Sequence, residues 1–174
     1  KELVDKVAKE SGFSHEFIEE IGEYASVTSS FLFNIAVSSH PMGLIDTMSV
    51  SDKLYVCQTN VIRDLASKGP CVIVGRCADY VLRDDPNAVL VNLFVHAPMA
   101  ARIRRESART NTTPAEAEKR IRQVDKERAA YYNFFSSKRW GDAQGYDLCV
   151  NTDGLEISDV AKLVLRYLEL RGLR

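Results

Sequence analysis

The sequence CVIVGRCADYVLRDDPNAVLVNLFVH, residues 71–96, decides the fold. It contains two apolar runs of strand length, CVIV and VLVNLFVH, which are rich in β-branched residues. Such runs are typical of strands that are buried on both faces of a parallel sheet packed between helices. Gly75-Arg76 follows the first run, and open α/β sheets bind their ligands at the carboxyl ends of their strands. An arginine there suits a phosphate, although an ordinary surface arginine after a strand-ending glycine fits the same residues.

The rest of the chain alternates helical and strand patterns, which indicates a parallel α/β sheet. The expected strands are 71–75, 89–95 and 146–151. The expected helices are 2–10, 15–25, 50–67, 77–83, 99–109, 113–134 and a last helix with Ile157, Val160, Val164 and Leu168 turned inward. The helix 50–67 has an apolar stripe of Leu54, Cys57, Val61 and Leu65. The helix after Thr113 begins with a capping-box pattern, in which Thr113 is the N-cap and Glu116 the third residue. The segment 28–48 fits either a helix or a strand, followed by a loop that contains the breakers Pro41 and Gly43.

The composition is that of an ordinary soluble globular domain, with 174 residues, 45% hydrophobic residues and a net charge of −1. This balance gives no basic field to recruit nucleic acid. No apolar run approaches the roughly 20 residues that span a membrane, and no signal peptide pattern is visible. The cysteines and histidines lack metal-ligand spacing, so we expect no metal held by side chains. We therefore expect a reduced, cytoplasmic protein.

The helix after Thr113 contains RIRQVDKERAAYY, in which Arg122, Asp125 and Arg128 recur every third residue. They share one broad face, because each step of three drifts only about 60° around the helix. A charged face is usually solvated and laced with ion pairs. Here further cations are close in the sequence, at Arg102, Arg104, Arg105, Lys138 and Arg139. So many cations near a strand-end Gly-Arg suit an enzyme that neutralises several phosphate charges.

The stretch GRCADYVLRDDPNAVLVNLFVHAPMAARIRRES, residues 75–107, resembles the bacterial cytidylate kinases. In those enzymes a Gly-Arg pair ends a strand, and a turn, a second strand and an arginine-rich helix follow. RQVDKER matches their Arg-x-x-Asp-x-x-Arg lid signature. The cytidylate-kinase-like family of P-loop proteins is similar over nearly the whole chain, from KEL through IVGR, KERAAYY and the Trp-Gly-Asp stretch to YDLCVNT. The order and spacing of these motifs carry the resemblance.

The resemblance implies an α/β fold of the P-loop kinase type, a three-layer parallel sheet with helices on both faces and a helical lid. It implies a single domain over 1–174, with a mobile acceptor-side segment at about 28–48 and an arginine-rich lid region at about 98–140. The implied activity is transfer of the γ-phosphate of ATP to a nucleoside monophosphate such as CMP or to a related small acceptor. Mg²⁺ would come with ATP, held mainly by the nucleotide phosphates.

The resemblance also implies catalytic residues. Arg76 would hold the phosphate of the acceptor. Arg122 and Arg128 would close over the transferring phosphoryl group, and Asp125 would help to place the acceptor or its partner arginine. Phosphoryl transfer needs positioning and cations more than covalent chemistry, so an arginine face on a mobile helix is suited to it.

Substrate-binding roles are implied for Arg76 and, as hinge or lid supports, for Arg102 and Arg105. Val74 and Cys77 stand where cytidylate kinases carry aspartates that help to read the nucleoside, which leaves the acceptor open. We interpret Cys77 as a spectator thiol. No glycine-rich phosphate loop and no Gly-Lys-Ser/Thr occurs in these residues. In the family that loop lies on an N-terminal strand, so we expect it on a segment that precedes them.

Two other functions fit parts of the sequence. A nucleotide-binding or regulatory module of the same fold could have lost turnover. An RNA-binding protein could use RRES at 104–107 and FFSSKRW at 134–140, but the net charge argues against it. We expect small nucleotides as partners, and neither nucleic acid nor a membrane. The aromatic residues of 131–135 would pack the lid or a contact between two copies, which leaves a homodimer open.

Overall fold

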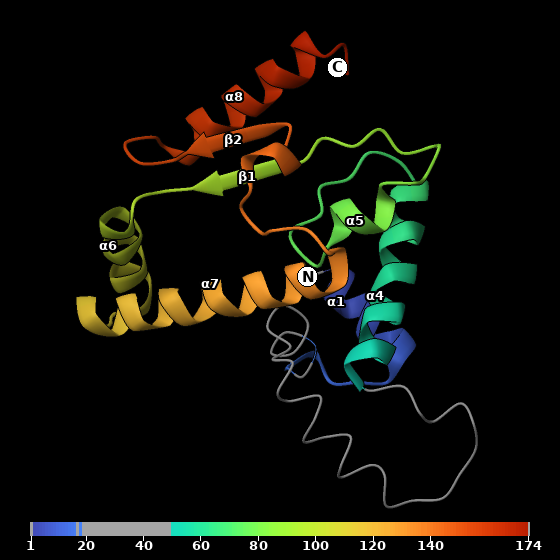
Figure 1. Cartoon of the computed structure of the whole chain (residues 1–174), viewed down its shortest axis with the longest axis horizontal. Coiled ribbons are helices and arrows are strands. Elements are labelled where there is room, and N and C mark those ends of the chain that lie inside the picture. Colours follow the sequence, from blue (N-terminus) through green and yellow to red (C-terminus); the bar gives the residue numbers. More distant parts are fainter. Residues whose placement is uncertain (1, 17, 19–49, 174) are drawn as a thin grey trace, which may run out of the picture. The chain divides into compact units, whose positions relative to one another are not determined.

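The structure is a computed structural model that describes residues 2–16, 18 and 50–173. These residues are rich in helix, and among them is one small parallel sheet (Figure 1). The helices are α1 (Glu2–Ser11), α4 (Val50–Ser67), α5 (Ala78–Leu82), α6 (Met99–Thr110), α7 (Pro114–Ser136) and α8 (Ile157–Leu170). The strands are β1 (Leu93–His96) and β2 (Leu148–Asn151), and η1 (Ala143–Gly145) is a single 3-10 turn. The segment predicted at 28–48 and most of the helix predicted at 15–25 lie outside the described residues.

The chain forms two compact units that alternate along the sequence. The first unit consists of residues 1–90 and 124–140, and the second of residues 91–123 and 141–174. Helix α7 contributes to both, because the boundary between the units falls after Gln123.

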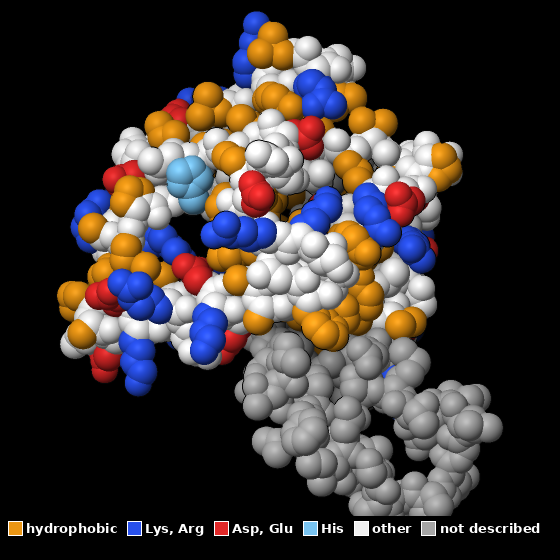
Figure 2. All heavy atoms as spheres, in the orientation of Figure 1, with side chains coloured by type: hydrophobic (Ala, Val, Ile, Leu, Met, Phe, Trp, Pro, Cys, Tyr) orange, Lys and Arg blue, Asp and Glu red, His pale blue; other side chains and the backbone are white. Residues whose placement is uncertain are grey.

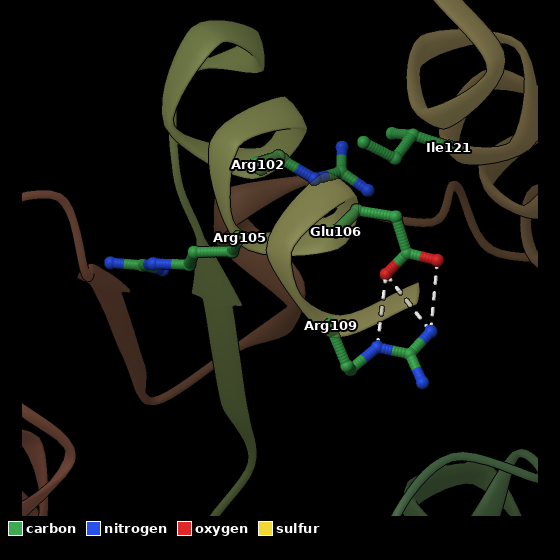
Figure 3. A pocket seen from close by; sticks show the side chains of 5 residues that line it. All are labelled: Arg102, Arg105, Glu106, Arg109 and Ile121. Atoms are coloured by element: carbon green, nitrogen blue, oxygen red, sulfur yellow. Dashed lines mark hydrogen bonds and ion pairs between the residues drawn. The ribbon is translucent and has the colours of Figure 1, made fainter. Parts of the chain in front are cut away.

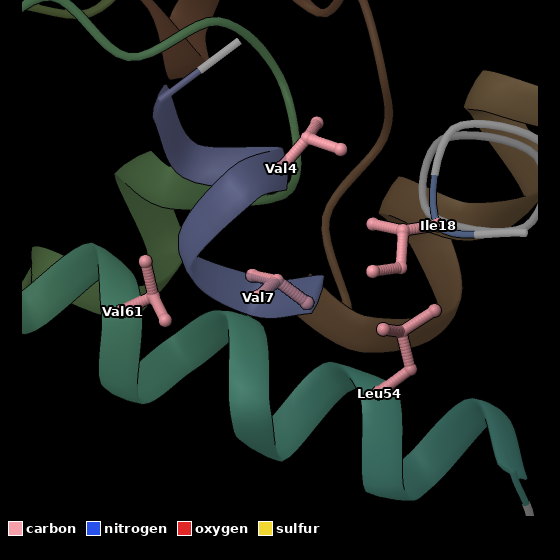
Figure 4. Close-up of a cluster of buried hydrophobic side chains, with 5 residues drawn as sticks. All are labelled: Val4, Val7, Ile18, Leu54 and Val61. Carbon is pink, nitrogen blue, oxygen red and sulfur yellow. The ribbon is translucent and has the colours of Figure 1, made fainter. Parts of the chain in front are cut away.

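In the first unit, α1 packs against α4 through a cluster of buried aliphatic side chains (Figure 4). The buried members are Val4, Val7, Ile18, Leu54 and Val61. Cys57 and Leu65 pack against this cluster, so the apolar stripe predicted for α4 is confirmed. A second buried cluster joins Ile62 of α4 to Val81 and Leu82 of α5.

In the second unit, β1 and β2 pair in parallel, with Leu93 opposite Leu148 and Val95 opposite Val150. Parallel strands need a crossover connection, and the chain between them contains α6, α7 and η1. The last helix meets the expectation in part, since Val160, Val164 and Leu168 are partly buried. Ile157 was predicted to turn inward and is 89% exposed, and α8 has no fully buried side chain. Figure 2 shows hydrophobic side chains interspersed with charged ones over the visible surface.

The strand predicted at 71–75 is absent from the structure. Residues 71–74 make no ladder with any described strand, and Val72 and Val74 are 93% and 78% exposed. The prediction failed because a strand requires hydrogen bonds to a neighbouring strand, which an apolar sequence alone does not supply. The second strand is also shorter than predicted, since it begins at Leu93. The described part of the chain therefore shows an α/β fold with a two-stranded parallel sheet.

Candidate functional site

The Gly75-Arg76-Cys77 turn, in the first unit, has an unusual backbone. Its three residues have φ values of 69°, 56° and 54°, all in the left-handed region. Glycine tolerates this conformation, whereas each L-residue with a Cβ is strained by about 1–2 kcal/mol. The turn leads directly into α5, where the amide of Val81 donates to the carbonyl of Cys77 at 2.9 Å.

The turn directs the Arg76 side chain into the protein. Arg76 is only 8% exposed and Cys77 only 2% exposed. An ordinary surface arginine is therefore the wrong interpretation of this position. A buried guanidinium acts in surroundings of low dielectric, where its attraction for an anion exceeds that of an arginine in water.

An aromatic cluster surrounds the turn. Its buried members are Cys77, Tyr131 and Tyr132, and the side chains packed against them are Tyr55, Tyr80, Phe135 and Trp140. The rings of Tyr55 and Phe135 stack with their centroids 4.0 Å apart. The predicted packing of the aromatic run holds for Tyr131 and Tyr132 within this unit, whereas Phe134 is 60% exposed.

Two tyrosine hydroxyls in the cluster form hydrogen bonds to other elements. Tyr131 donates to Oε1 of Gln58 on α4 at 3.3 Å, and Tyr132 donates to Oδ2 of Asp79 on α5 at 2.6 Å. Burial raises the pKa of Tyr131 and the proximity of Cys77 raises it further, while the positive charge of Arg76 acts in the opposite direction. Tyr131 is therefore a neutral hydroxyl that lies within the electrostatic reach of Arg76.

The Cys77 thiol is not activated by its arginine neighbour. Burial, followed by the negative charge of Asp79, raises the pKa of Cys77 to about 12. The group is a protonated thiol at neutral pH, and the thiolate is the form that acts as a nucleophile. This agrees with its interpretation as a spectator.

The arginine face predicted on one helix lies on α7. This helix begins with the predicted capping box, in which the Thr113 amide donates to Glu116 at 2.9 Å and the Glu116 amide donates to the Thr113 hydroxyl at 3.3 Å. Arg122 binds Glu118 through Nε and Nη2, at 2.9 and 2.7 Å, and its side chain is 65% exposed. A solvated helical ion pair therefore describes Arg122 in this structure.

Asp125 and Arg128 belong to the first unit, as Arg76 does, and both are half-buried. Tyr131, which packs against Cys77, follows Arg128 by three residues on the same helix face. Arg128 is therefore one helical turn from the residue that contacts the Gly75-Arg76-Cys77 turn. Arg122 lies in the second unit.

A second group of arginines lines a cavity of about 210 Å³ in the second unit (Figure 3). The lining residues are Arg102, Arg105, Glu106, Arg109 and Ile121. Figure 3 shows the Glu106 carboxylate turned toward Arg109 and the Arg105 side chain pointing away from both. Glu106 binds Arg109 at 2.8 Å and also Arg120 of α7 at 3.2 Å. This carboxylate therefore neutralises part of the positive charge and links α6 to α7.

Sequence reasoning missed two parts of these sites. The pairing of Glu106 with Arg109 could have been predicted, because opposite charges three residues apart on one helix commonly form ion pairs. The signal for Gln58 was a polar residue between Leu54 and Ile62 on an otherwise apolar face of α4.

In the part of the chain that the structure describes, no three His, Cys, Asp or Glu side chains gather as metal ligands would. None of the described helices is long and apolar enough to cross a membrane.

Comparison with known proteins gives a family and a fold. Residues 1–154 match the sequence profile of the cytidylate kinase-like family. The structure is similar to the crystal structure of an uncharacterized protein from Eubacterium ventriosum ATCC 27560, with a TM-score of 0.64 and 23% sequence identity. This match covers 96% of the present chain and 89% of the other, and at that identity it shows a shared fold. No curated protein matches the sequence.

Proposed function

This chain belongs to the cytidylate kinase-like family, and on that premise we propose that it is an ATP-dependent phosphotransferase. It moves the γ-phosphate of ATP to a nucleoside monophosphate, such as CMP, or to a related small acceptor. The three-layer sheet of the P-loop kinases is part of the same proposal. The observation that carries it is the buried Arg76, held in a left-handed turn within the compact unit that also contains Asp125 and Arg128.

In this proposal Arg76 binds the phosphate of the acceptor. A guanidinium presents two parallel N–H donors to phosphate oxygens, and that of Arg76 is largely shielded from water, because the residue is only 8% exposed. The turn fixes where the Arg76 side chain starts, and the burial of that side chain limits the orientations of its donors before the substrate arrives. Orientation of this kind supplies much of the rate in phosphoryl transfer, for which the protein contributes little covalent chemistry.

Arg128 acts from α7, where it neutralises charge on the transferring phosphoryl group. Asp125, one turn earlier, orients the acceptor or a partner arginine. Arg122 must exchange its pairing with Glu118 before it can contribute. ATP would supply the phosphoryl group, and its Mg²⁺ would neutralise phosphate charge. The buried guanidinium and the half-buried Arg128 fit such a polyanion.

The test is formation of ADP by the full-length protein with ATP, Mg²⁺ and each nucleoside monophosphate in turn. We expect Arg76→Lys, which keeps the charge but loses the two-pronged donor, to lower turnover by about tenfold or more. Arg76→Ala and Arg128→Ala should lower it by orders of magnitude while the protein stays folded. Arg166→Ala on α8 is the matched control, because Arg166 is an exposed arginine paired with Glu169. Wild-type turnover in Arg76→Ala, or no ADP from the wild-type protein with any acceptor, would contradict the proposal.

A nucleotide-binding module without turnover is the second candidate. Two arginines that the sequence assigned to the substrate are held by other residues, Arg122 by Glu118 and Arg105 by Thr152. This function predicts that the wild-type protein binds a nucleoside monophosphate in equilibrium dialysis, with loss of binding in Arg76→Ala. It also predicts that the wild-type protein forms no more ADP than Arg76→Ala does.

A further inference from the structure

A buried polar pair lies beside the Arg76 turn. Gln58 of α4 is 1% exposed and Tyr131 of α7 is 6% exposed, and the Tyr131 hydroxyl donates to Gln58 Oε1 at 3.3 Å. Gln58 Nε2 has no hydrogen-bond partner among the described residues. A buried amide that is only half satisfied destabilises a fold, whereas a leucine at this position would pack without that cost. Packing alone therefore gives no reason for a glutamine here.

The position of the pair offers another reason. Cys77, the neighbour of Arg76 in the turn, packs with Tyr131 in one buried cluster. Arg76 directly precedes Cys77, so the Tyr131 side chain packs against the turn that carries Arg76, and the positive charge of Arg76 opposes the rise in the pKa of the Tyr131 hydroxyl. A hydroxyl that donates its proton to Gln58 keeps its oxygen as an acceptor, which is the group that a guanidinium needs. The hydrogen bond to Gln58 therefore fixes the direction in which that acceptor faces.

We propose that Gln58 and Tyr131 are positioning residues for the acceptor-phosphate site. Their hydrogen bond holds α7, which carries Arg128 one turn before Tyr131, in register with the turn that carries Arg76. It also keeps the Tyr131 oxygen turned so that the Arg76 guanidinium has one orientation. The inference rests on the proposed function and extends it, because it gives α4 a part in binding the nucleoside monophosphate.

The chain offers a matched pair of variants. Tyr131→Phe and Tyr132→Phe each remove one buried phenol oxygen from adjacent residues of the same helix and the same cluster. Tyr132 makes the shorter hydrogen bond, 2.6 Å to Asp79, so its loss should destabilise the fold at least as much. The Tyr131 hydroxyl binds Gln58 of α4, whereas the Tyr132 hydroxyl binds Asp79 of α5. If general destabilisation weakens binding of the nucleoside monophosphate, both variants should show the loss. If positioning matters, the loss should be larger in Tyr131→Phe.

Trp140 provides the readout for binding. It is the single tryptophan of the chain and packs against this cluster, so its fluorescence should respond to a ligand at Arg76. The full-length protein is titrated with CMP, UMP, AMP and GMP, and the one that gives the largest signal is used. We expect Tyr131→Phe to weaken its binding by about tenfold, the loss that one hydrogen bond commonly causes. KM for the acceptor should rise by a similar factor and kcat should change less. Tyr132→Phe should weaken binding less than Tyr131→Phe does, although it lowers the melting temperature at least as much.

A double variant separates positioning from stability. Gln58→Leu combined with Tyr131→Phe leaves no unpaired polar atom of the pair, so the melting temperature should recover relative to Gln58→Leu alone. Binding of the nucleoside monophosphate should stay weak, because nothing orients Arg76. Recovery of both stability and binding would overturn the proposal.

The remaining outcomes distinguish the two levels of inference. If wild-type binding is lost in Arg76→Ala but unchanged in Tyr131→Phe, the positioning role is overturned and the proposed function stands. If the wild-type protein binds none of the four nucleotides and forms no ADP with them, the proposed function is overturned and the positioning role with it.

Discussion

Arg105 is bound to Thr152, the residue that follows β2. Its Nη1 donates to the Thr152 hydroxyl at 2.8 Å, and its Nη2 donates to the Thr152 carbonyl. Thr152 in turn donates its amide to the carbonyl of His96, at the end of β1, at 2.8 Å. The guanidinium thus connects α6 to the carboxyl ends of both strands, through the donors that a phosphate would otherwise bind.

Arg105→Ala should therefore destabilise the protein by about 1 kcal/mol, the net value of a hydrogen bond in a partly exposed site. Arg104→Ala is the matched control, since Arg104 is the adjacent arginine and its contact of 3.4 Å with Asp153 is exposed. Its effect should be below about 0.5 kcal/mol. Urea unfolding followed by circular dichroism measures both. Equal stability of the two variants would show that the contact with Thr152 contributes nothing.

Leu54 and Val56 test the packing of α4 on α1. Leu54 is 2% exposed within the cluster around Val7, while Val56 is 46% exposed on the same helix. Leu54→Ala leaves a cavity and should cost about 2–5 kcal/mol. Val56→Ala should change the free energy of unfolding by less than about 0.5 kcal/mol. The prediction fails if both variants melt at the wild-type temperature.

The capping box at the start of α7 should make stability depend on pH. The hydrogen bond from the Thr113 side chain, and then that from its backbone, lower the pKa of Glu116. A carboxyl whose pKa is lower in the folded state stabilises the fold above its unfolded pKa, and this contribution is lost as the pH falls through the folded value. Thr113→Ala should raise the pKa of Glu116 in an NMR titration. Its destabilising effect should diminish at acidic pH, and a pH-independent effect would contradict the mechanism.

The raised pKa of Cys77 predicts low reactivity toward iodoacetamide at pH 8. Cys71 and Cys149 are exposed, so they should be alkylated well before Cys77, which is both buried and protonated. Peptide mapping after brief labelling measures the order. Urea should remove the difference, because unfolding exposes all of these thiols. Labelling of Cys77 as fast as Cys71 in the folded protein would show that the thiol is accessible and activated.

The features that the sequence predicted correctly are local ones. The buried stripe of α4 follows from spacing along one helix, and the Thr113–Glu116 box follows from two side chains three residues apart. The strand at 71–75 was wrong because pairing depends on residues far away in the chain. The prediction that Ile157 turns inward was wrong for a similar reason. Helical periodicity identifies the apolar face of a helix but does not show which part of the protein covers that face.

In the candidate site, too, the sequence predicted the local features and missed those that depend on distant residues. The sequence placed Arg76 after an apolar run, but its burial comes from a left-handed turn that two strained residues, Arg76 and Cys77, adopt. The sequence placed Arg122 and Arg128 on one helix, and the pairing of Arg122 with Glu118 at a spacing of four was overlooked. The contact between Gln58 and Tyr131 joins residues 73 positions apart, beyond the reach of any local pattern.

The alternation of the two units along the chain has a consequence for biosynthesis. The first unit includes residues 124–140, so the ribosome must add about 50 residues beyond Leu90 before that unit can be completed. At typical rates of translation this takes roughly 3–10 seconds. The aliphatic cluster of α1 and α4 can gather during that interval, whereas the aromatic cluster needs Tyr131 and Tyr132. The nascent chain therefore completes the packing around the Arg76 turn late, only after α7 has left the exit tunnel.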